Sequence, residues 1–272
     1  MSKEIHRPTP DKKRLRRTMM FMNAQKPGLI KDAYIYGTDS IILDLEDAVA
    51  ENQKDAARFS LYHALKSIDY GDTEVIVRIN GLDTPHWQED IRVCVAGGAD
   101  GIRIAKCESA EMVRTVDAAV TAAEKEFGVE EGRTLLMAAL ESPLGIMNAY
   151  EIVTASPRMF GCAISGGDFR KSMHVQIQRD GVEMMVARGQ MLLAARAAGV
   201  QCFDTMYPNE TFAPTEKEIA YAEKLVRGCQ AQADAGIGVY TVDGKMVDIP
   251  FFEDAKRIIA LAKACGVYHG EL

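Results

Sequence analysis

The sequence predicts a (β/α)8 TIM barrel, in which eight parallel strands form a ring and a helix follows each strand. Short, continuous apolar runs alternate with longer segments of helical period. The short runs are bounded by Gly, Asp or Asn, as in parallel strands buried on both faces. Seven alternations follow one another, and parallel strands need helical crossovers. An open doubly wound sheet is the competing fold, but the Gly-rich turn expected after its first strand is absent from Met22-Asn23-Ala24-Gln25.

Each predicted element follows from this pattern. The predicted strands are Met19–Met22, Ser40–Leu45, Glu74–Ile79, Gly101–Lys106, Thr134–Leu140, Met159–Ser165 and Gln201–Asp204. The predicted helices include Lys54–Ser67, Ala110–Phe127, Pro143–Ala155 and Gly181–Ala198. Ser142 and Asp180 are candidate N-caps for the helices that follow them.

The pattern breaks after the seventh strand. Met206-Tyr207-Pro208-Asn209-Glu210 leads directly to a helix from Thr215, without a seventh helix or an eighth strand. A seven-stranded ring would leave backbone groups unpaired at the gap. Either the barrel is unusually open, or a segment between strands seven and eight is missing from this sequence, and we favour the second explanation.

We expect two parts, a barrel over residues 1–214 and a C-terminal part over residues 215–272. The second part would hold the last barrel helix, Thr215–Gly236, followed by a lid. A β-hairpin from Gly238 to Asp248 turns at Asp243-Gly244, and a last helix, Phe251–Cys265, follows Pro250. Such a lid is able to reach over a neighbour's barrel mouth.

Composition excludes several classes of protein. A net charge of -7 argues against a nucleic-acid binder. The basic run Lys12–Arg17 is either a solvated arm or subunit contact, or an anion- or partner-binding segment. Six cysteines without a C-x-x-C pair form neither a zinc motif nor a disulfide framework. With no apolar run long enough to span a membrane and no signal peptide, we expect a cytoplasmic protein.

Charged residues recur where the predicted strands end. In barrels of this kind, active residues lie at the carboxyl ends of the strands. Taken alone, each of these residues is explained by a helix cap or a rim ion pair, but together they predict a site. The candidates are Asp44, Glu46, Asp47, Arg78, Asn80, Lys106, Glu141 and Asp168.

The residue types indicate chemistry on an oxo acid or hydroxy acid. Glu141 and Asp168 are a plausible pair for Mg²⁺, which takes one or two carboxylates and completes its shell with substrate and water. Gly166-Gly167 would allow a close approach of backbone and substrate. Arg78 is suited to two-point binding of a carboxylate. A metal and a carboxylate clamp together suit a substrate whose developing charge needs stabilisation.

Several motifs, in this order, are highly specific. They are Ile42-Leu43-Asp44-Leu45-Glu46-Asp47-Ala48-Val49, Lys54-Asp55-Ala56-Ala57-Arg58, Val77-Arg78-Ile79-Asn80, Glu141-Ser142-Pro143-Leu144-Gly145-Ile146, Phe203-Asp204-Thr205, Phe212-Ala213-Pro214-Thr215 and Asp243-Gly244-Lys245-Met246-Val247-Asp248. From about Arg16 to Ala264 the chain resembles the citrate lyase β-subunit family, within the wider superfamily of HpcH/HpaI-type aldolases and malyl-CoA lyases. The resemblance implies a TIM barrel that forms trimers or pairs of trimers.

The resemblance also implies roles for individual residues. Glu141 and Asp168 would hold Mg²⁺, and Glu46 and Asp47 would support metal-bound waters. Arg78 would hold the oxaloacetate part of the substrate, with Lys106 and Gly166-Gly167 beside it. Asp248 in the lid would be the acid that protonates the thioester methyl carbon, often in the neighbouring subunit's site.

The activity implied is cleavage of a citryl thioester to oxaloacetate and an acetyl thioester. In the citrate lyase complex the thioester is carried by the acyl carrier (gamma) subunit, which works with the alpha subunit. Two alternatives stay open. One is a stand-alone lyase or thioesterase acting on malyl-CoA or citramalyl-CoA, for which Lys12–Arg17 is the candidate phosphate-binding segment. The other is an inactive scaffold subunit.

The chain departs from the family pattern in four places. Phe21-Met22-Asn23-Ala24 replaces Phe-Val-Pro-Gly, and Ile104-Ala105-Lys106 replaces Leu-Pro-Lys. Ser165-Gly166-Gly167-Asp168-Phe169 replaces Gly-Ala-Glu-Asp-Tyr, which keeps the metal-binding Asp and removes the acid beside it. The Asp-rich loop, seventh helix and Gly-Lys-x-x-Ile-x-Pro strand are absent, at the position where the strand count fails. A changed acyl substrate or an incomplete barrel mouth would follow from these differences.

Overall fold

The computed structural model describes residues 9–176, 181–204, 214–234, 240–243, 245–247 and 249–271. The chain divides into two compact units, Met1–Pro208 and Asn209–Leu272. Each unit is described by itself below.

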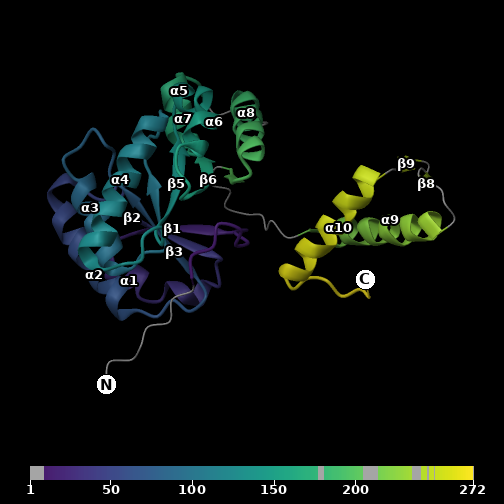
Figure 1. Ribbon diagram of the computed structural model, residues 1–272, viewed down its shortest axis with the longest axis horizontal. Coiled ribbons are helices and arrows are strands. Elements are labelled where there is room, and N and C mark those ends of the chain that lie inside the picture. The colour runs from purple at the N-terminus through teal and green to yellow at the C-terminus, as the bar shows by residue number, and fades with distance from the viewer. Residues whose placement is uncertain are drawn as a thin grey trace. The chain divides into compact units, whose positions relative to one another are not determined.

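The first unit is built on one all-parallel sheet of seven strands, paired in chain order from β1 to β7 (Figure 1). The strands are β1 (Met19–Asn23), β2 (Ser40–Asp44), β3 (Glu74–Ile79), β4 (Gly101–Ile104), β5 (Leu135–Leu140), β6 (Met159–Ile164) and β7 (Gln201–Phe203). The predicted parallel α/β architecture and the count of seven strands are confirmed. Among the described residues no strand pairs β7 with β1, so the sheet is a curved half-barrel with two edges.

In the described part of the first unit, helices follow the strands of this sheet. They are α1 (Pro27–Ile30), α2 (Lys54–Ser67), α3 (Trp87–Gly97), α4 (Ala110–Phe127), α5 (Pro143–Met147), α6 (Ala149–Thr154), α7 (Gly166–Met173) and α8 (Val182–Ala198), with 3-10 turns η1 (Ala33–Tyr36) and η2 (Glu51–Gln53). The bounds predicted for α2 and α4 are confirmed residue for residue.

One predicted helix, Pro143–Ala155, is wrong as a single element. It is divided at Asn148, whose backbone leaves the helical region and whose side chain donates a 2.8 Å hydrogen bond to the carbonyl of Glu108. Ser142 caps α5 as predicted, because its hydroxyl accepts from the Gly145 amide. The other predicted cap, Asp180, lies outside the described residues.

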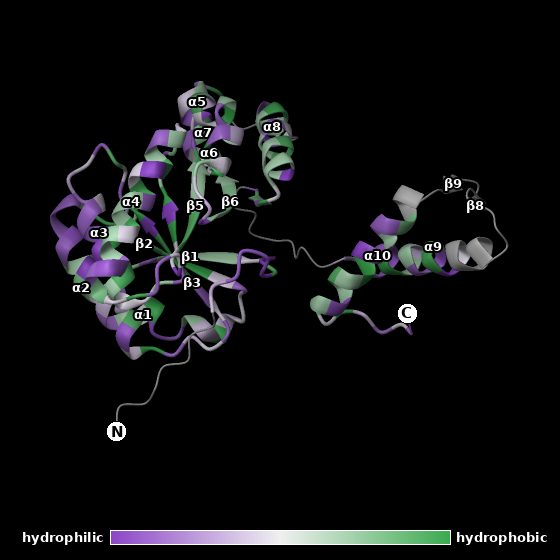
Figure 2. Ribbon diagram, viewed as in Figure 1, coloured by the Kyte–Doolittle hydropathy of each residue, from purple (hydrophilic) through white to green (hydrophobic). Residues whose placement is uncertain are grey.

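The sheet separates two apolar layers. Successive side chains of each strand point to opposite faces of the sheet. One set points into the half-barrel, and the other points outward against the helices. The inner layer consists of Ile42, Ile76, Leu135, Met137, Phe160 and Ala163, with Met19 and Phe203 packed against it. Figure 2 shows the strands as mainly hydrophobic and the outer faces of α2 and α3 as largely hydrophilic. The polar residues at the strand ends therefore border an apolar layer inside the half-barrel.

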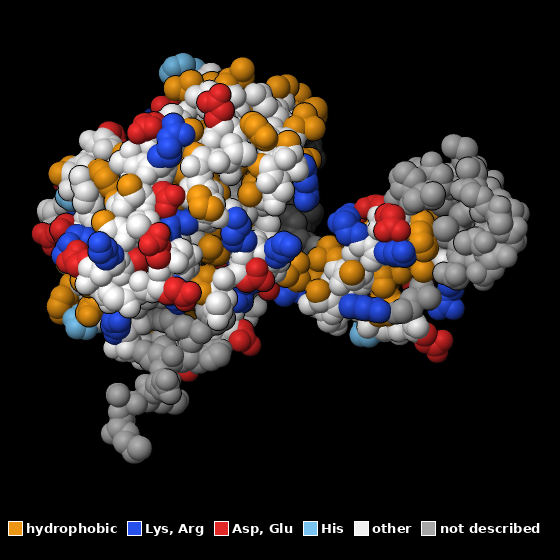
Figure 3. All heavy atoms as spheres, viewed as in Figure 1, with side chains coloured by type: hydrophobic (Ala, Val, Ile, Leu, Met, Phe, Trp, Pro, Cys, Tyr) orange, Lys and Arg blue, Asp and Glu red, His pale blue; other side chains and the backbone are white. Residues whose placement is uncertain are grey.

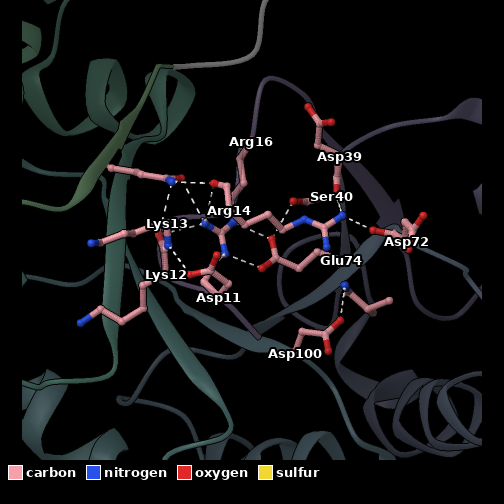
Figure 4. A network of polar contacts seen from close by, with 12 residues as sticks. Asp11, Lys12, Lys13, Arg14, Arg16, Asp39, Ser40, Asp72, Glu74 and Asp100 are labelled. Carbon is pink, nitrogen blue, oxygen red and sulfur yellow. Dashed lines mark hydrogen bonds and ion pairs between the residues drawn. The ribbon is translucent and has the colours of Figure 1, made fainter. Parts of the chain in front are cut away.

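The amino-terminal end of the half-barrel is closed by a polar network around Arg16 (Figure 4). Its Nε donates to Glu74 Oε2 at 2.6 Å, Nη1 donates to Gln201 Oε1 at 3.2 Å, and its guanidinium carbon lies 4.1 Å from the centre of the Phe160 ring. Gln201 in turn donates to the carbonyl of Arg14 at 2.7 Å. The segment before β1 thus contacts the first residue of β7, so the two sheet edges approach each other at this end.

The basic run Lys12–Arg17 has a structural role in this network. Arg14 donates to the backbone carbonyls of Asp39 and Asp72, and Arg17 forms a two-point pair with Asp39 at 2.7 and 2.9 Å. Carboxylates and carbonyls of the same chain therefore engage all three arginines of the run.

The second unit contains α9 (Glu216–Asp234), the antiparallel strands β8 (Tyr240–Val242) and β9 (Lys245–Val247), and α10 (Ile249–Ala264). It has its own small core of Ala222, Leu225, Val242, Ala255 and Ile259. Helix α10 begins before Pro250, which lies in its first turn, where the missing amide hydrogen costs nothing. None of the helices in the described ranges is long and apolar enough to cross a membrane.

Candidate active site

Asp44 and Arg78 form the centre of a charged cluster at the carboxyl edge of the sheet. They lie opposite each other in the register of β2 and β3. Arg78 Nε donates to Asp44 Oδ1 at 2.8 Å and Nη2 donates to Oδ2 at 2.6 Å, which is the two-point geometry. Asp44 is only 3% exposed and also accepts from the amide of Glu46 at 3.0 Å. This carboxylate therefore fixes both the arginine and the turn that follows β2.

Glu46 joins Arg78 to Lys106. Its Oε2 lies 2.9 Å from Arg78 Nη1 and its Oε1 lies 2.7 Å from Lys106 Nζ. Asp47 is exposed and lies 3.6 Å from the same ammonium group. The hydrogen bond from Lys106 to Glu46 raises the pKa of this lysine above its ordinary value. Lys106 has a backbone φ of 48°, a left-handed conformation that non-glycine residues rarely adopt and that recurs at functional sites.

Lys54 holds the loop that carries Glu46 and Asp47. It is buried, and its Nζ donates to the backbone carbonyls of Leu45 and Glu46, both at 2.8 Å. Burial lowers the pKa of this lysine. Asn80, in contrast, has a structural role, because its amide and side chain donate to Asp90 Oδ2 at 2.9 and 2.7 Å.

Glu141 follows β5 and is 4% exposed. The Ser165 hydroxyl donates to its Oε1 at 3.2 Å, whereas Oε2 has no hydrogen-bond partner among the residues that the structure describes. Burial raises the pKa of Glu141 to about 6, and the carboxylates of Glu46 and Asp168 act in the same direction. Gly145 lets α5 lie close to the segment that follows β4, because a Cβ on it would lie 2.7 Å from the Cys107 carbonyl oxygen.

Asp168 lies in the first turn of α7, half-buried, and its charge acts on Glu141. Gly166 is buried, while Gly167 is exposed and a Cβ on it would meet nothing within 4 Å. The space above Gly167 is therefore open. Asp248, predicted to be the acid, lies outside the described residues.

The donor set fits a hard divalent cation. A buried carboxylate oxygen without a partner, beside a second carboxylate, is suited to Mg²⁺, which prefers oxygen ligands. No group of three His, Cys, Asp or Glu side chains in the described part of the chain is arranged as a metal site. Mg²⁺ does not require one, since substrate and water oxygens complete its shell. Glu141 and Asp168 are thus the residues that would hold it.

Arg103 and Ser165 belong to the cluster but were not predicted as site residues from the sequence. Arg103 lies within β4 and is 4% exposed, and its Nη2 donates to the Ser165 hydroxyl at 2.9 Å. The Phe21 ring lies beside both arginines of the cluster. Its centre is 5.2 Å from the guanidinium carbon of Arg78 and from that of Arg103. An arginine inside an otherwise apolar strand was the available signal.

Fold and site together define a class of protein: a parallel α/β half-barrel with carboxylates and basic side chains gathered at the carboxyl edge of its sheet. Residues 17–221 match the model of the HpcH/HpaI aldolase/citrate lyase family. The chain belongs to this family.

Two curated relatives and one solved structure indicate where in the family the chain lies. It is 42% identical over 285 residues to the citrate lyase subunit beta of Leuconostoc mesenteroides subsp. cremoris, covering 92% of this chain and 94% of that one. A (3S)-malyl-CoA thioesterase of Cereibacter sphaeroides is 29% identical, covering 93% and 96%. The citrate lyase beta subunit of M. tuberculosis, solved with oxaloacetate and magnesium, matches with a TM-score of 0.57 at 25% identity, covering 89% and 97%.

Proposed function

We propose that this chain cleaves a citryl thioester into oxaloacetate and an acetyl thioester, with Mg²⁺ as its cofactor. The observation that carries the proposal is the buried carboxylate of Glu141, with the half-buried Asp168 acting on it, beside the Arg78 cluster, in a chain 42% identical to a citrate lyase beta subunit. The chain is an oxo-acid lyase of the family to which it belongs.

In this proposal some residues of the chain bind the substrate and others transfer protons. When bound, Mg²⁺ supplies a Lewis acid that lowers the pKa of the substrate hydroxyl. Arg78 has five N–H groups, of which three face Asp44 and Glu46, so two remain for a substrate carboxylate. Lys106 adds a half-exposed positive charge at the same edge.

The bond that breaks joins the hydroxyl-bearing carbon to the methylene carbon beside the thioester. The substrate hydroxyl loses its proton to solvent, the electron pair of the broken carbon–carbon bond passes to the thioester as an enolate, and the hydroxyl-bearing carbon becomes the ketone of oxaloacetate. We assign to Asp248 the donation of a proton to the enolate carbon, which completes the methyl group of the acetyl thioester. General acid catalysis contributes about 10²–10⁴-fold to a rate.

Assembly with other subunits is part of the proposal. We expect a homotrimer or hexamer that works with the alpha and acyl carrier subunits of a citrate lyase complex. An apolar face on α5 and α8 supports assembly, because Met147, Val186 and Leu193 are 69%, 80% and 74% exposed. Contiguous exposed apolar surface of this kind marks interaction sites. Figure 3 shows hydrophobic side chains gathered over α5 and α8.

The gap in the strand count is also part of the proposal. The alignment with the Leuconostoc subunit spans 285 residues, more than the 272 residues of this chain, so the relative has residues without a counterpart here. This supports an eighth strand and seventh helix missing from the sequence, with the last barrel helix and the lid following them in residues 215–272. A reducing, cytoplasmic setting is supported by the free thiols of Cys94, Cys107, Cys162, Cys202 and Cys265.

The structure does not favour the two alternatives. A stand-alone enzyme for free coenzyme A would use Lys12–Arg17 for the nucleotide phosphates, but Arg14, Arg16 and Arg17 are paired within the chain. The run also precedes β1, at the end of the sheet opposite Glu141. An inactive scaffold would not need a buried, unpartnered carboxylate oxygen.

A substrate comparison tests the proposal. Purified protein with Mg²⁺ receives citryl-CoA or (3S)-malyl-CoA, and oxaloacetate is detected through malate dehydrogenase while glyoxylate is detected chemically. We expect kcat/KM for citryl-CoA to exceed that for malyl-CoA by about 10⁴-fold, the scale on which a site that hydrogen-bonds a substrate group rejects an analogue without that group. Cleavage of malyl-CoA alone would replace the proposed function with the stand-alone lyase.

A further inference from the structure

The two oxygens of Glu141 have different surroundings. Oε1 accepts a hydrogen bond from Ser165 Oγ at 3.2 Å, and Oε2 is buried without a partner in the described ranges. A carboxylate held by one oxygen keeps the other in a fixed direction. The direction of that free oxygen therefore depends on Ser165.

The hydrogen of the Ser165 hydroxyl is directed toward Glu141 by Arg103. Arg103 Nη2 lies 2.9 Å from Ser165 Oγ, and a guanidinium group only donates. The serine oxygen must accept this bond with a lone pair, so its single hydrogen is available for Glu141 Oε1. Three side chains from β4, β5 and the β6–α7 junction are thus joined in one ordered chain of donors and acceptors.

Arg103 itself is buried in the cluster. It is 4% exposed, lies in register between Arg78 of β3 and Met137 of β5, and has the Phe21 ring 5.2 Å from its guanidinium carbon. A buried arginine beside a second arginine is costly unless its charge is used. The carboxylate that it reaches through Ser165 is the one with an unpartnered oxygen.

We propose that Arg103 and Ser165 are positioning residues that hold Glu141 Oε1 and leave Oε2 directed at the bound divalent cation. This inference rests on the proposed metal site. Partners of metal ligands commonly orient them in this way, and losing such a partner costs about 10- to 100-fold in metal affinity.

A Mn²⁺-binding titration tests the proposal without a turnover assay. Free Mn²⁺ is quantified by its electron paramagnetic resonance signal. We expect Ser165→Ala to weaken Mn²⁺ binding by about tenfold and Arg103→Met to weaken it at least as much. Ser165→Thr keeps the hydroxyl and should bind within about twofold of the unsubstituted chain. Ser67→Ala, at an exposed position of α2, is the matched control.

Thermal unfolding of each metal-free variant separates positioning from a general loss of structure. The expected result for Ser165→Ala is an unfolding temperature close to that of the control together with weaker Mn²⁺ binding. Mn²⁺ binding by Ser165→Ala as tight as that of the unsubstituted chain would overturn the positioning role and leave the proposed function intact. An unsubstituted chain that binds no Mn²⁺ would overturn both.

Discussion

Glu141 carries a cost in the metal-free chain because its charge is buried and one oxygen is unpartnered. Burial raises its pKa from an ordinary value near 4.5 to about 6. For a carboxyl group with a raised folded-state pKa, stability is highest below the unfolded-state pKa and is lost as pH rises through the folded-state value. The negative charge of Glu141, which would bind a cation, thus destabilises the folded chain when no metal is bound.

Replacing this charge should stabilise the metal-free protein. We expect Glu141→Gln to raise the free energy of unfolding at pH 7.5 by about 2 kcal/mol, with no difference from the unsubstituted chain below about pH 4. The amide oxygen of Gln still accepts from Ser165. Urea unfolding in EDTA at both pH values checks this. A variant less stable at pH 7.5 would contradict the idea that the charge is uncompensated.

The sequence identified the residues at strand ends but not the contacts between them. Asp44, Glu46, Arg78, Lys106 and Glu141 stand out because charges follow apolar strands. The Ser165 bridge could not be predicted, because it joins residues from three strands whose register only the folded sheet defines. The pairing of Asn80 with Asp90 likewise depends on how α3 packs.

Among the elements, those with a strong apolar period were predicted best. Helix α4 is one example, with Ser109 at its N-cap and Gly128 at its C-cap. Helix α7 was not predicted, because Gly166-Gly167 is a loop signal and eight residues give too short a period. Helix α3 was also not among the predicted helices.

Helix α4 is anchored to the sheet by a buried ion pair. Glu124 is fully buried and accepts from the amides of Thr134 and Gly132 at 2.8 and 2.9 Å, while Arg158 Nη2 lies 2.6 Å from its Oε2. Burial alone would raise the pKa of Glu124, but the hydrogen bonds from Arg158 and the two amides outweigh it and hold the pKa below its ordinary value. The carboxylate thus stabilises the fold in its charged form.

Removing this charge should destabilise the first unit. We expect Glu124→Gln to lower the free energy of unfolding by about 3 kcal/mol near pH 7, because Arg158 loses a buried partner. A lowered carboxyl pKa gives stability that is present above the ordinary pKa and lost as pH falls below it. The difference between variant and unsubstituted chain should therefore shrink in urea unfolding below about pH 4.5. A pH-independent difference would contradict the role of the charge.

At the scale of the whole molecule, α8 is apolar on two opposite faces. Met184, Ala187 and Met191 pack on the sheet, whereas Val186 and Leu193 are exposed on the other side. Gln190 of this helix donates to Met147 Sδ at 3.5 Å, so the exposed face continues onto α5. Apolar faces of a helix are normally covered, so the exposed face of α8 is suited to contact with another chain.

Charge on this face should therefore disrupt assembly. We expect the double variant Val186→Glu, Leu193→Glu to lower the molar mass in light scattering after gel filtration, to that of a single chain. The unfolding temperature of the first unit should change little, because both positions are exposed. Lys171→Glu, at an exposed position of α7, is the control. An unchanged mass would exclude this face from the assembly interface.

The most direct test of the account is Mg²⁺-dependent release of oxaloacetate from citryl-CoA. The unsubstituted chain and a Glu111→Gln control, altered at an exposed site on α4, should both show activity that EDTA removes and Mg²⁺ restores. Glu141→Gln should lose at least about 100-fold at every Mg²⁺ concentration. Oxaloacetate release by Glu141→Gln at the unsubstituted rate, or release that EDTA does not affect, would contradict the proposed metal site and the reaction built on it.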